Sequence, residues 1–125
     1  MTTCEKEQQN SGIIRYDELR KLVNEDRVHL IDVRSNEEVK NSGKIGKATV
    51  IPVATINDAL QLPEKEFTHR YGITKPSFDD DRLVFSCTAG VRCKTAWETA
   101  RELGFTKSRY YEGSWREWAA KENLN

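Results

Sequence analysis

The sequence predicts an α/β fold, in which a parallel β-sheet is covered by helices on both faces. The first observation is that short apolar runs alternate along the 125 residues with segments of helical periodicity, an order that favours parallel strand pairing. The second is that the runs at Leu30–Val33 and Leu83–Phe85 are apolar at nearly every position, as in strands buried on both faces. A chain of this length is expected to bury one core.

Short apolar runs bounded by polar or turn residues predict the strands. In chain order these runs are Gly12–Arg15, His29–Arg34, Ala48–Val53, Leu83–Cys87 and Arg109–Gly113. Ligands of open parallel sheets bind at the carboxyl ends of the strands. The second predicted strand ends in Asp32 and Arg34, and the fourth ends in Cys87, so these residues are the first candidates for a functional site.

Apolar periodicity and start and stop residues predict the helices between these strands. The predicted helical segments are Tyr16–Glu25, Asn36–Asn41, Pro63–Gly72, Cys93–Leu103 and Ser114–Glu122. In the second of them, Ser35 and Glu38 have the spacing of a capping box, and Gly43 is placed to end the helix.

The overall composition excludes several classes of partner. The chain has 20 basic and 20 acidic residues, so no global field favours nucleic acid or an anionic membrane. No apolar run approaches the ~20 residues that cross a bilayer. Residues 1–11 lack the parts of a secretion signal and are expected to form a disordered tail, whereas residues 12–125 are expected to form the domain.

The cysteines indicate a reducing compartment. There are 3 of them, and none forms a CxxC pair, so neither a disulfide framework nor a zinc site is predicted. We therefore expect a cytoplasmic protein without a bound metal.

The segment SCTAGVRCKTA, residues 86–96, carries the strongest chemical signal. If a strand ends at Cys87 and a helix begins at Cys93, the residues from Thr88 to Arg92 must turn sharply and leave several backbone N–H groups unpaired. Gly90 permits the positive φ that such a turn needs, and the helix dipole adds partial positive charge. Both effects favour a thiolate, which predicts that Cys87 is a nucleophile.

Other interpretations of these residues stay open at this point. Cys87 taken alone could be a buried strand residue and Arg92 a solvated loop charge, but the order strand, Cys, Gly, Arg, helix favours the nucleophile. Asp32 and Arg34 could be functional, although an ion pair that supports the rim of the sheet is favoured. Cys93 is either a small filler beneath the loop or a second thiol that could form a disulfide with Cys87.

Several of these motifs together resemble the rhodanese-like sulfurtransferases of the single-domain type, from Gly12 to Glu122. The resemblance rests on LIDVRSNEEVKNSGKIGKATVIPV, on the loop CTAGVRC and on YYEGSWREWAAKE. It implies a five-stranded, mainly parallel sheet and a cysteine that carries a persulfide between a sulfur donor and an acceptor, with no cofactor. Cys87 would be the sulfur carrier, and Asp32 and Arg34 would support the site without touching substrate. The loop positions that would contact substrate are Thr88, Ala89, Gly90, Val91 and Cys93.

By this resemblance, Cys87 attacks a donor such as thiosulfate and passes the sulfur to a thiol or to cyanide. Arg92 would stabilise the thiolate or steer the donor. Thr88 and Ala89 are uncharged where two-domain thiosulfate enzymes carry basic residues, which leaves the donor open. The alternatives are a cysteine-dependent phosphatase or arsenate reductase, which uses a similar ring of N–H groups, and a non-catalytic rhodanese-like module that only contacts proteins. Protein partners and oligomeric state are not predicted.

Overall fold

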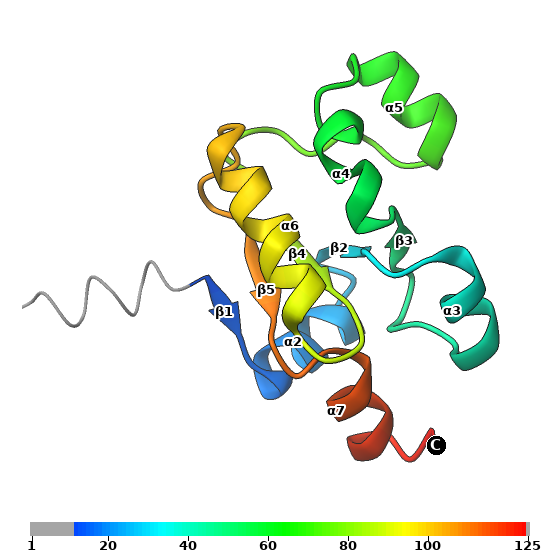
Figure 1. Ribbon diagram of the computed structural model, residues 1–125. Helices are drawn as coiled ribbons and strands as arrows, with labels where there is room; N and C mark the ends of the chain where they lie inside the picture. Colours follow the sequence, from blue (N-terminus) through cyan, green and yellow to red (C-terminus); the bar gives the residue numbers. More distant parts are fainter. Residues whose placement is uncertain (1–11, 125) are drawn as a thin grey trace, which may run out of the picture.

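The computed structural model describes residues 12–124, so the predicted tail with Cys4 lies outside the described residues, as does Asn125. The described chain forms a five-stranded sheet in the order β1-β5-β4-β2-β3 (Figure 1). Every pairing in it is parallel, which confirms the predicted fold class. The strands are β1 (Ile13–Ile14), β2 (His29–Asp32), β3 (Thr49–Val50), β4 (Leu83–Ser86) and β5 (Arg109–Tyr111).

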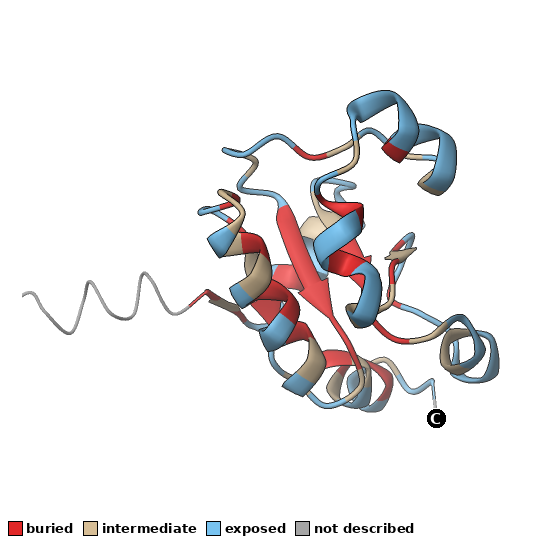
Figure 2. Cartoon of the chain, turned by 45° about the horizontal axis from the view of Figure 1, so that its top comes forward, coloured by how far each residue is buried: buried red, intermediate tan, exposed pale blue. Residues whose placement is uncertain are grey.

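Helices cover both faces of this sheet, as predicted. They are α2 (Tyr16–Asn24), α3 (Asn36–Ser42), α4 (Val53–Ala59), α5 (Glu64–Tyr71), α6 (Val91–Glu102) and α7 (Ser114–Lys121). In β4, Leu83 and Phe85 pack in one apolar cluster with residues of α4, α5 and α6, whereas Val84 packs in a second cluster with residues of α2 and α7. The central strands are therefore buried on both sides (Figure 2), which is why they appear as apolar runs in the sequence.

The structure corrects the prediction around the third strand. Strand β3 covers only Thr49–Val50 of the predicted Ala48–Val53, and Val53 is instead the first residue of α4, a helix that the sequence pattern does not predict. Pro52 explains the change, because it has no N–H to donate and its φ of −55° suits the position before a helix.

The start of α6 is a second correction. This helix begins at Val91 rather than Cys93, so Val91 and Arg92 belong to its first turn and the connecting loop is shorter than predicted. Strand β4 ends at Ser86, which makes Cys87 the first residue after the strand.

The predicted capping box of α3 is confirmed. The Glu38 N–H donates to Ser35 Oγ at 3.1 Å, the Ser35 N–H donates to Glu38 Oε1 at 3.0 Å, and Gly43 ends the helix with a φ of 95°.

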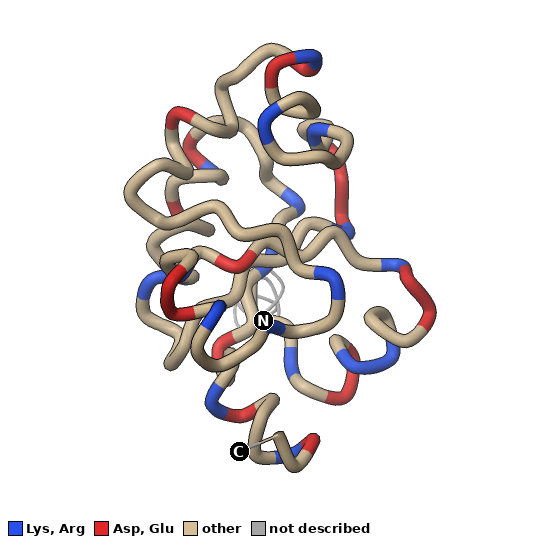
Figure 3. The backbone as a smooth tube through the Cα atoms, turned by 90° about the vertical axis from the view of Figure 1, so that its right-hand side faces the viewer, with Lys and Arg blue, Asp and Glu red and all other residues tan. Residues whose placement is uncertain are grey.

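Charge is distributed evenly over the described part of the chain. Basic and acidic segments are mixed along the backbone (Figure 3), in line with the balanced composition. Within residues 12–124, no helix is long and apolar enough to cross a bilayer.

Candidate active site

The carboxyl ends of the two central strands meet at one edge of the sheet. Strands β2 and β4 pair in parallel with Asp32 opposite Ser86, and the Val33 N–H donates to the Ser86 carbonyl at 2.8 Å. The chain that leaves β4 at Cys87 therefore starts beside the turn that carries Arg34. This is the edge where ligands of parallel sheets bind.

The Cys87 sulfur accepts hydrogen bonds from the loop and from α6. The N–H groups of Gly90 and Cys93 each donate to Cys87 Sγ at 3.2 Å. The first N–H groups of a helix have no acceptor within the helix, and here the sulfur accepts one of them. Only 1% of Cys87 is exposed, so these bonds lie in a region from which water is largely excluded.

Gly90 is the residue that permits this turn. Its φ is 97°, and a Cβ added at this position would lie 2.4 Å from the carbonyl oxygen of Glu112. Both the backbone conformation and the close approach therefore require glycine.

The N-terminus of α7 fixes the loop from the opposite side. The N–H of Trp115 donates to the Cys87 carbonyl at 2.9 Å, and that of Arg116 donates to the Thr88 carbonyl at 3.1 Å. Ser114 Oγ accepts the Cys87 N–H at 3.0 Å and lies 3.7 Å from Cys87 Sγ. In Figure 1 the loop that enters α6 lies directly against α7, so two helix N-termini surround the nucleophile.

These contacts favour an ionised Cys87. The adjacent Cys93 thiol, the Cys93 and Gly90 N–H groups and the Ser114 hydroxyl lower the pKa of Cys87 to about 5, although burial acts in the opposite direction. The same coupling raises the pKa of Cys93, so that thiol stays protonated beside the thiolate. Cys87 thus has the electrostatic environment of a reactive cysteine.

Arg92 lies in the first turn of α6, and its guanidinium pairs with a carboxylate. It donates to Glu38 Oε1 at 2.8 Å and Oε2 at 2.9 Å, and to Thr88 Oγ1 at 3.2 Å. The bidentate pair lowers the pKa of Glu38 to about 2 and raises that of Arg92. Arg92 therefore ties α6 to α3, and the hydrogen bonds to the Cys87 sulfur come from other groups.

Asp32 and Arg34 form the ion pair that the sequence favours. Arg34 Nη2 donates to Asp32 Oδ2 at 2.7 Å and to the Gly43 carbonyl at 2.7 Å, and both partners are 1% exposed. The guanidinium also lies 5.3 Å from the centre of the Trp115 ring. This pair connects β2, the end of α3 and α7, and so supports the rim around the site.

Comparison with known proteins identifies the family. Residues 15–121 match the family described as the rhodanese-like domain. The chain belongs to this family. A solved structure of a human single-domain sulfurtransferase superposes on this rhodanese-like domain with a TM-score of 0.84 and 41% identity, covering 88% of this chain and 96% of that one.

Two sequence relatives support the same assignment. A human thiosulfate:glutathione sulfurtransferase is 43% identical over 106 residues, which are 85% of this chain and 91% of that protein. A mitochondrial thiosulfate sulfurtransferase of Saccharomyces cerevisiae is 43% identical over 111 residues, which are 87% of this chain and 73% of that protein. With relatives this similar over most of both chains, the rhodanese-like domain is an enzyme of the sulfurtransferase class.

Glu38 and Ser114 are among the residues of this rhodanese-like domain that contact the site without being predicted there. Glu38 is predicted only as a helix cap, and Ser114 only as a helix start. Each is far in sequence from its partner, Arg92 and Cys87 respectively. The capping-box and helix-start patterns describe local structure only, and no local pattern reports a contact over such a distance.

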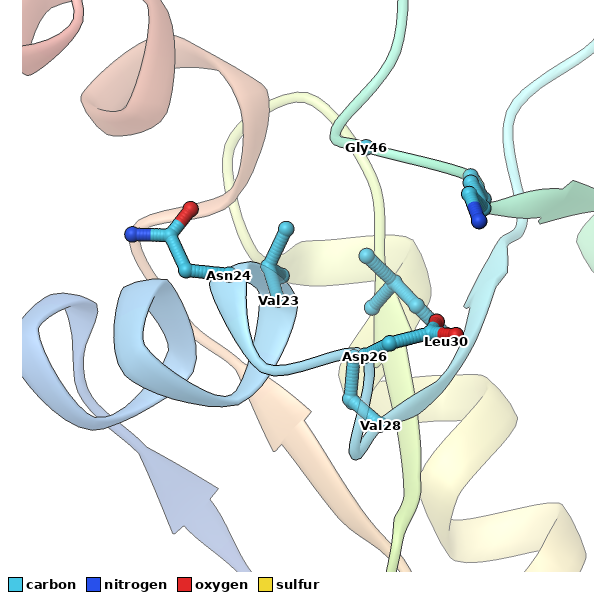
Figure 4. Close-up of a pocket in the computed structure, with 7 residues that line it drawn as sticks. Val23, Asn24, Asp26, Val28, Leu30 and Gly46 are labelled. Atoms are coloured by element: carbon cyan, nitrogen blue, oxygen red, sulfur yellow. The ribbon is translucent and has the colours of Figure 1, made fainter.

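A separate cavity of about 280 Å³ lies beside the end of α2 (Figure 4). Its lining includes Val23, Asn24, Asp26, Val28, Leu30 and Gly46. This lining contains no thiol and no residue of the Cys87 loop, so the cavity is distinct from the candidate active site.

Proposed function

We propose that the protein transfers a sulfane sulfur from a thiosulfate-type donor to a small thiol through a persulfide on Cys87. The observation that supports this best is the sulfur's environment: Cys87 Sγ is buried and accepts two backbone N–H groups at 3.2 Å. With a pKa of about 5, it is ionised at neutral pH and ready to attack.

In the first step, the Cys87 thiolate attacks the outer sulfur of thiosulfate. The new bond joins Cys87 Sγ to that sulfur, the bond between the two sulfurs of the donor breaks, and its electron pair leaves with sulfite. Cys87 then carries an anionic persulfide. The loop N–H groups and the N-terminus of α6 stabilise this negative charge without a metal or cofactor.

In the second step, an acceptor thiolate attacks the outer sulfur of the persulfide. That sulfur passes to the acceptor, and the Cys87 thiolate is regenerated. Because the human relative is named a thiosulfate:glutathione sulfurtransferase, we propose thiosulfate and glutathione as the pair for this chain. Cyanide serves as the laboratory acceptor and gives thiocyanate.

The loop residues divide between substrate contact and support in this proposal. Ala89 and Val91 are exposed next to the nucleophile, so they and Thr88 would contact the donor and the acceptor. Gly90 would supply an N–H group to the sulfur. Arg92 is paired with Glu38, so we propose that it holds the loop in place and does not act as a free positive charge for anionic donors.

The phosphatase alternative is less well supported by the loop. The segment between Cys87 and Arg92 is one residue shorter than in cysteine-dependent phosphatases, and the Arg92 guanidinium is already paired with a carboxylate. We expect the ring to enclose one sulfur atom and leave too little room for a tetrahedral phosphate. Negligible hydrolysis of aryl phosphates would agree with this proposal.

The deciding experiment is intact mass after incubation with thiosulfate, followed by peptide mapping. We expect a gain of one sulfur atom on the Cys87 peptide, which cyanide or glutathione removes.

The Cys87→Ser variant should fold, gain no sulfur and form no thiocyanate, because a serine hydroxyl is not ionised at neutral pH. Cys4→Ser is the matched control and should behave as wild type. Thiocyanate formation by Cys87→Ser, or sulfur found on another residue of the wild type, would refute the proposal that Cys87 carries the sulfur.

We propose a cytoplasmic location for this activity. The free thiols of Cys87 and Cys93 are suited to a reducing compartment, whereas the Saccharomyces relative is named as mitochondrial. Cell fractionation with detection of the endogenous protein separates the two. Recovery in the mitochondrial fraction would contradict the proposed location without affecting the proposed reaction.

A further inference from the structure

Ser114, the first residue of α7, combines burial with an uncommon backbone conformation. It is 0% exposed, and its φ of 52° lies in the left-handed region that residues other than glycine rarely adopt. Asp26 and Asn123 also have positive φ, but both are exposed at helix ends. A buried serine keeps such a conformation only where its surroundings hold it, and strain of this kind gathers at functional sites.

The Ser114 hydroxyl contacts the nucleophile in two ways. It accepts the Cys87 N–H at 3.0 Å, and it lies 3.7 Å from Cys87 Sγ. It also lies 2.7 Å from the Tyr111 carbonyl and 3.5 Å from Cys93 Sγ. One hydroxyl thus joins the main chain and the sulfur of Cys87 to β5 and α6.

The protons in this cluster can be counted. Ser114 and Cys93 each have one proton to donate, and the acceptors within reach are the Tyr111 carbonyl, the Cys87 thiolate and the Ser114 oxygen itself. In one arrangement Ser114 donates to Tyr111 at 2.7 Å, and Cys93 donates to Ser114 Oγ at 3.5 Å. In the other, Ser114 donates to Cys87 at 3.7 Å, and Cys93 donates to Tyr111 at 3.6 Å. The second arrangement gives the Cys87 sulfur a side-chain donor, and Cys93 then supplies the proton that the Tyr111 carbonyl accepts.

We infer that Ser114 is a positioning residue for sulfur transfer, whose hydroxyl holds the Cys87 main chain and donates to the Cys87 sulfur. Without this hydroxyl, the Cys87 sulfur loses its side-chain donor at 3.7 Å, and the buried Cys87 N–H loses its acceptor. The inference deepens the proposed function, because it rests on Cys87 as the sulfur carrier.

The test compares Ser114→Gly and Ser114→Ala with the wild type. Both variants remove the hydroxyl, but alanine keeps the Cβ of serine at this positive φ, whereas glycine adopts the conformation without strain. A change in the Cys87 thiolate that both variants share therefore reports the hydroxyl and not the backbone conformation. The readout is the rate of Cys87 alkylation by iodoacetamide between about pH 4 and about pH 8, located by peptide mapping. The charged neighbours Arg92 and Glu38 stay in place in both variants. Asp26→Gly relieves the same backbone conformation far from Cys87 and is the matched control.

We expect the apparent pKa of Cys87 to rise in both Ser114 variants, with about tenfold slower alkylation below pH 5 for each unit of rise, and kcat/KM for thiosulfate to fall in the same acidic range. Asp26→Gly should match the wild type. A Ser114→Gly variant with wild-type alkylation and wild-type kcat/KM would overturn the inference. A failure of the proposed function gives a different result. Wild-type protein would then show no gain of sulfur in intact mass after incubation with thiosulfate, whatever effect the Ser114 variants have on the pKa of Cys87.

Discussion

At the scale of single residues, the site is built around one sulfur atom. Cys87 provides the nucleophile, and its hydrogen bonds come from the loop, from α6 and from α7. Most of the donors are backbone N–H groups, whose positions depend on the fold rather than on residue type. A sequence can therefore name Cys87 and Gly90, but the N–H groups that act on the sulfur become visible only when the helix starts are known.

The first prediction concerns the pH dependence of sulfur transfer. The pKa of Cys87 is lowered from 9.0 to about 5, so the reactive thiolate is present at neutral pH and is lost as the pH falls through about 5. We expect kcat/KM for thiosulfate to be constant near neutral pH. Below the pKa of Cys87, about 5, it should fall about tenfold for each pH unit.

Stability gives an independent measure of the same shift. Because folding lowers this pKa, the thiolate stabilises the folded state fully above the unfolded value of 9.0, and this stabilisation is lost as the pH falls through about 5. The free energy of unfolding of the wild type relative to Cys87→Ser should follow that trend. An activity profile with an apparent pKa near that of a free thiol, about 8.5, would contradict this prediction.

The second prediction concerns Cys93. Both thiols are free and buried, and the Cys93 N–H donates to Cys87 Sγ at 3.2 Å, so the two cysteines are neighbours in the site. Peroxide would oxidise the Cys87 thiolate to a sulfenic acid, which removes the negative charge that keeps Cys93 protonated. The Cys93 thiol would then condense with the sulfenic acid to form a Cys87–Cys93 disulfide and water.

The measurement is peptide mapping and assay after mild peroxide, before and after a reducing thiol. Wild type should show the disulfide and regain activity. Cys93→Ser, which keeps a hydrogen-bond donor but cannot form the disulfide, should become irreversibly oxidised. Should wild type show no disulfide, and both proteins lose and regain activity alike, Cys93 serves only as packing.

At the scale of elements, three helices meet at the Cys87 loop. The N-terminal turns of α6 and α7 direct N–H groups at it, and α3 holds Arg92 through Glu38. The sequence predicts α3 accurately because its start and stop signals are local. It places the start of α6 too late, because Val91 and Arg92 carry no start signal and the turn at Gly90 sets the boundary. It misses α4, a seven-residue helix that follows Pro52, because the apolar run before it continues into its first residue.

The third prediction tests the turn at Gly90. Gly90→Ala should abolish sulfur transfer and destabilise the fold by about 2 kcal/mol or more, because the new Cβ would lie 2.4 Å from the Glu112 carbonyl at a φ of 97°. Gly72→Ala is the matched control: its φ is 75°, and a Cβ there meets nothing within 4 Å. It should cost about 1 kcal/mol and leave activity unchanged. Urea unfolding and thiocyanate formation measure both effects, and an active Gly90→Ala variant would show that the loop does not need this turn.

At the scale of the whole molecule, two apolar clusters lie on opposite faces of the sheet and position its carboxyl edge. The central strands β2 and β4 match their predicted segments to within two residues, because burial on both faces leaves a continuous apolar signal. The edge strand β3 is shorter than predicted, because Pro52 ends the extended segment and α4 begins at Val53. The site could be located at the end of β4 from the sequence, but the Arg92–Glu38 and Ser114–Cys87 contacts depend on how distant helices pack.

The last prediction concerns where the folded domain begins. The Gly12 carbonyl accepts the Tyr110 N–H at 2.7 Å, a Cβ at Gly12 would lie 2.2 Å from the Trp97 ring, and Ile14 is 1% exposed in the apolar cluster with α2 and α7. A chain that lacks residues 2–10 should therefore keep wild-type stability and sulfur transfer. Removal of residues 2–14 also deletes β1 and should cost about 3 kcal/mol, because a buried isoleucine and its strand pairing are lost. Thermal unfolding of the two truncated chains measures the difference, and equal destabilisation by both would place the domain boundary before residue 10.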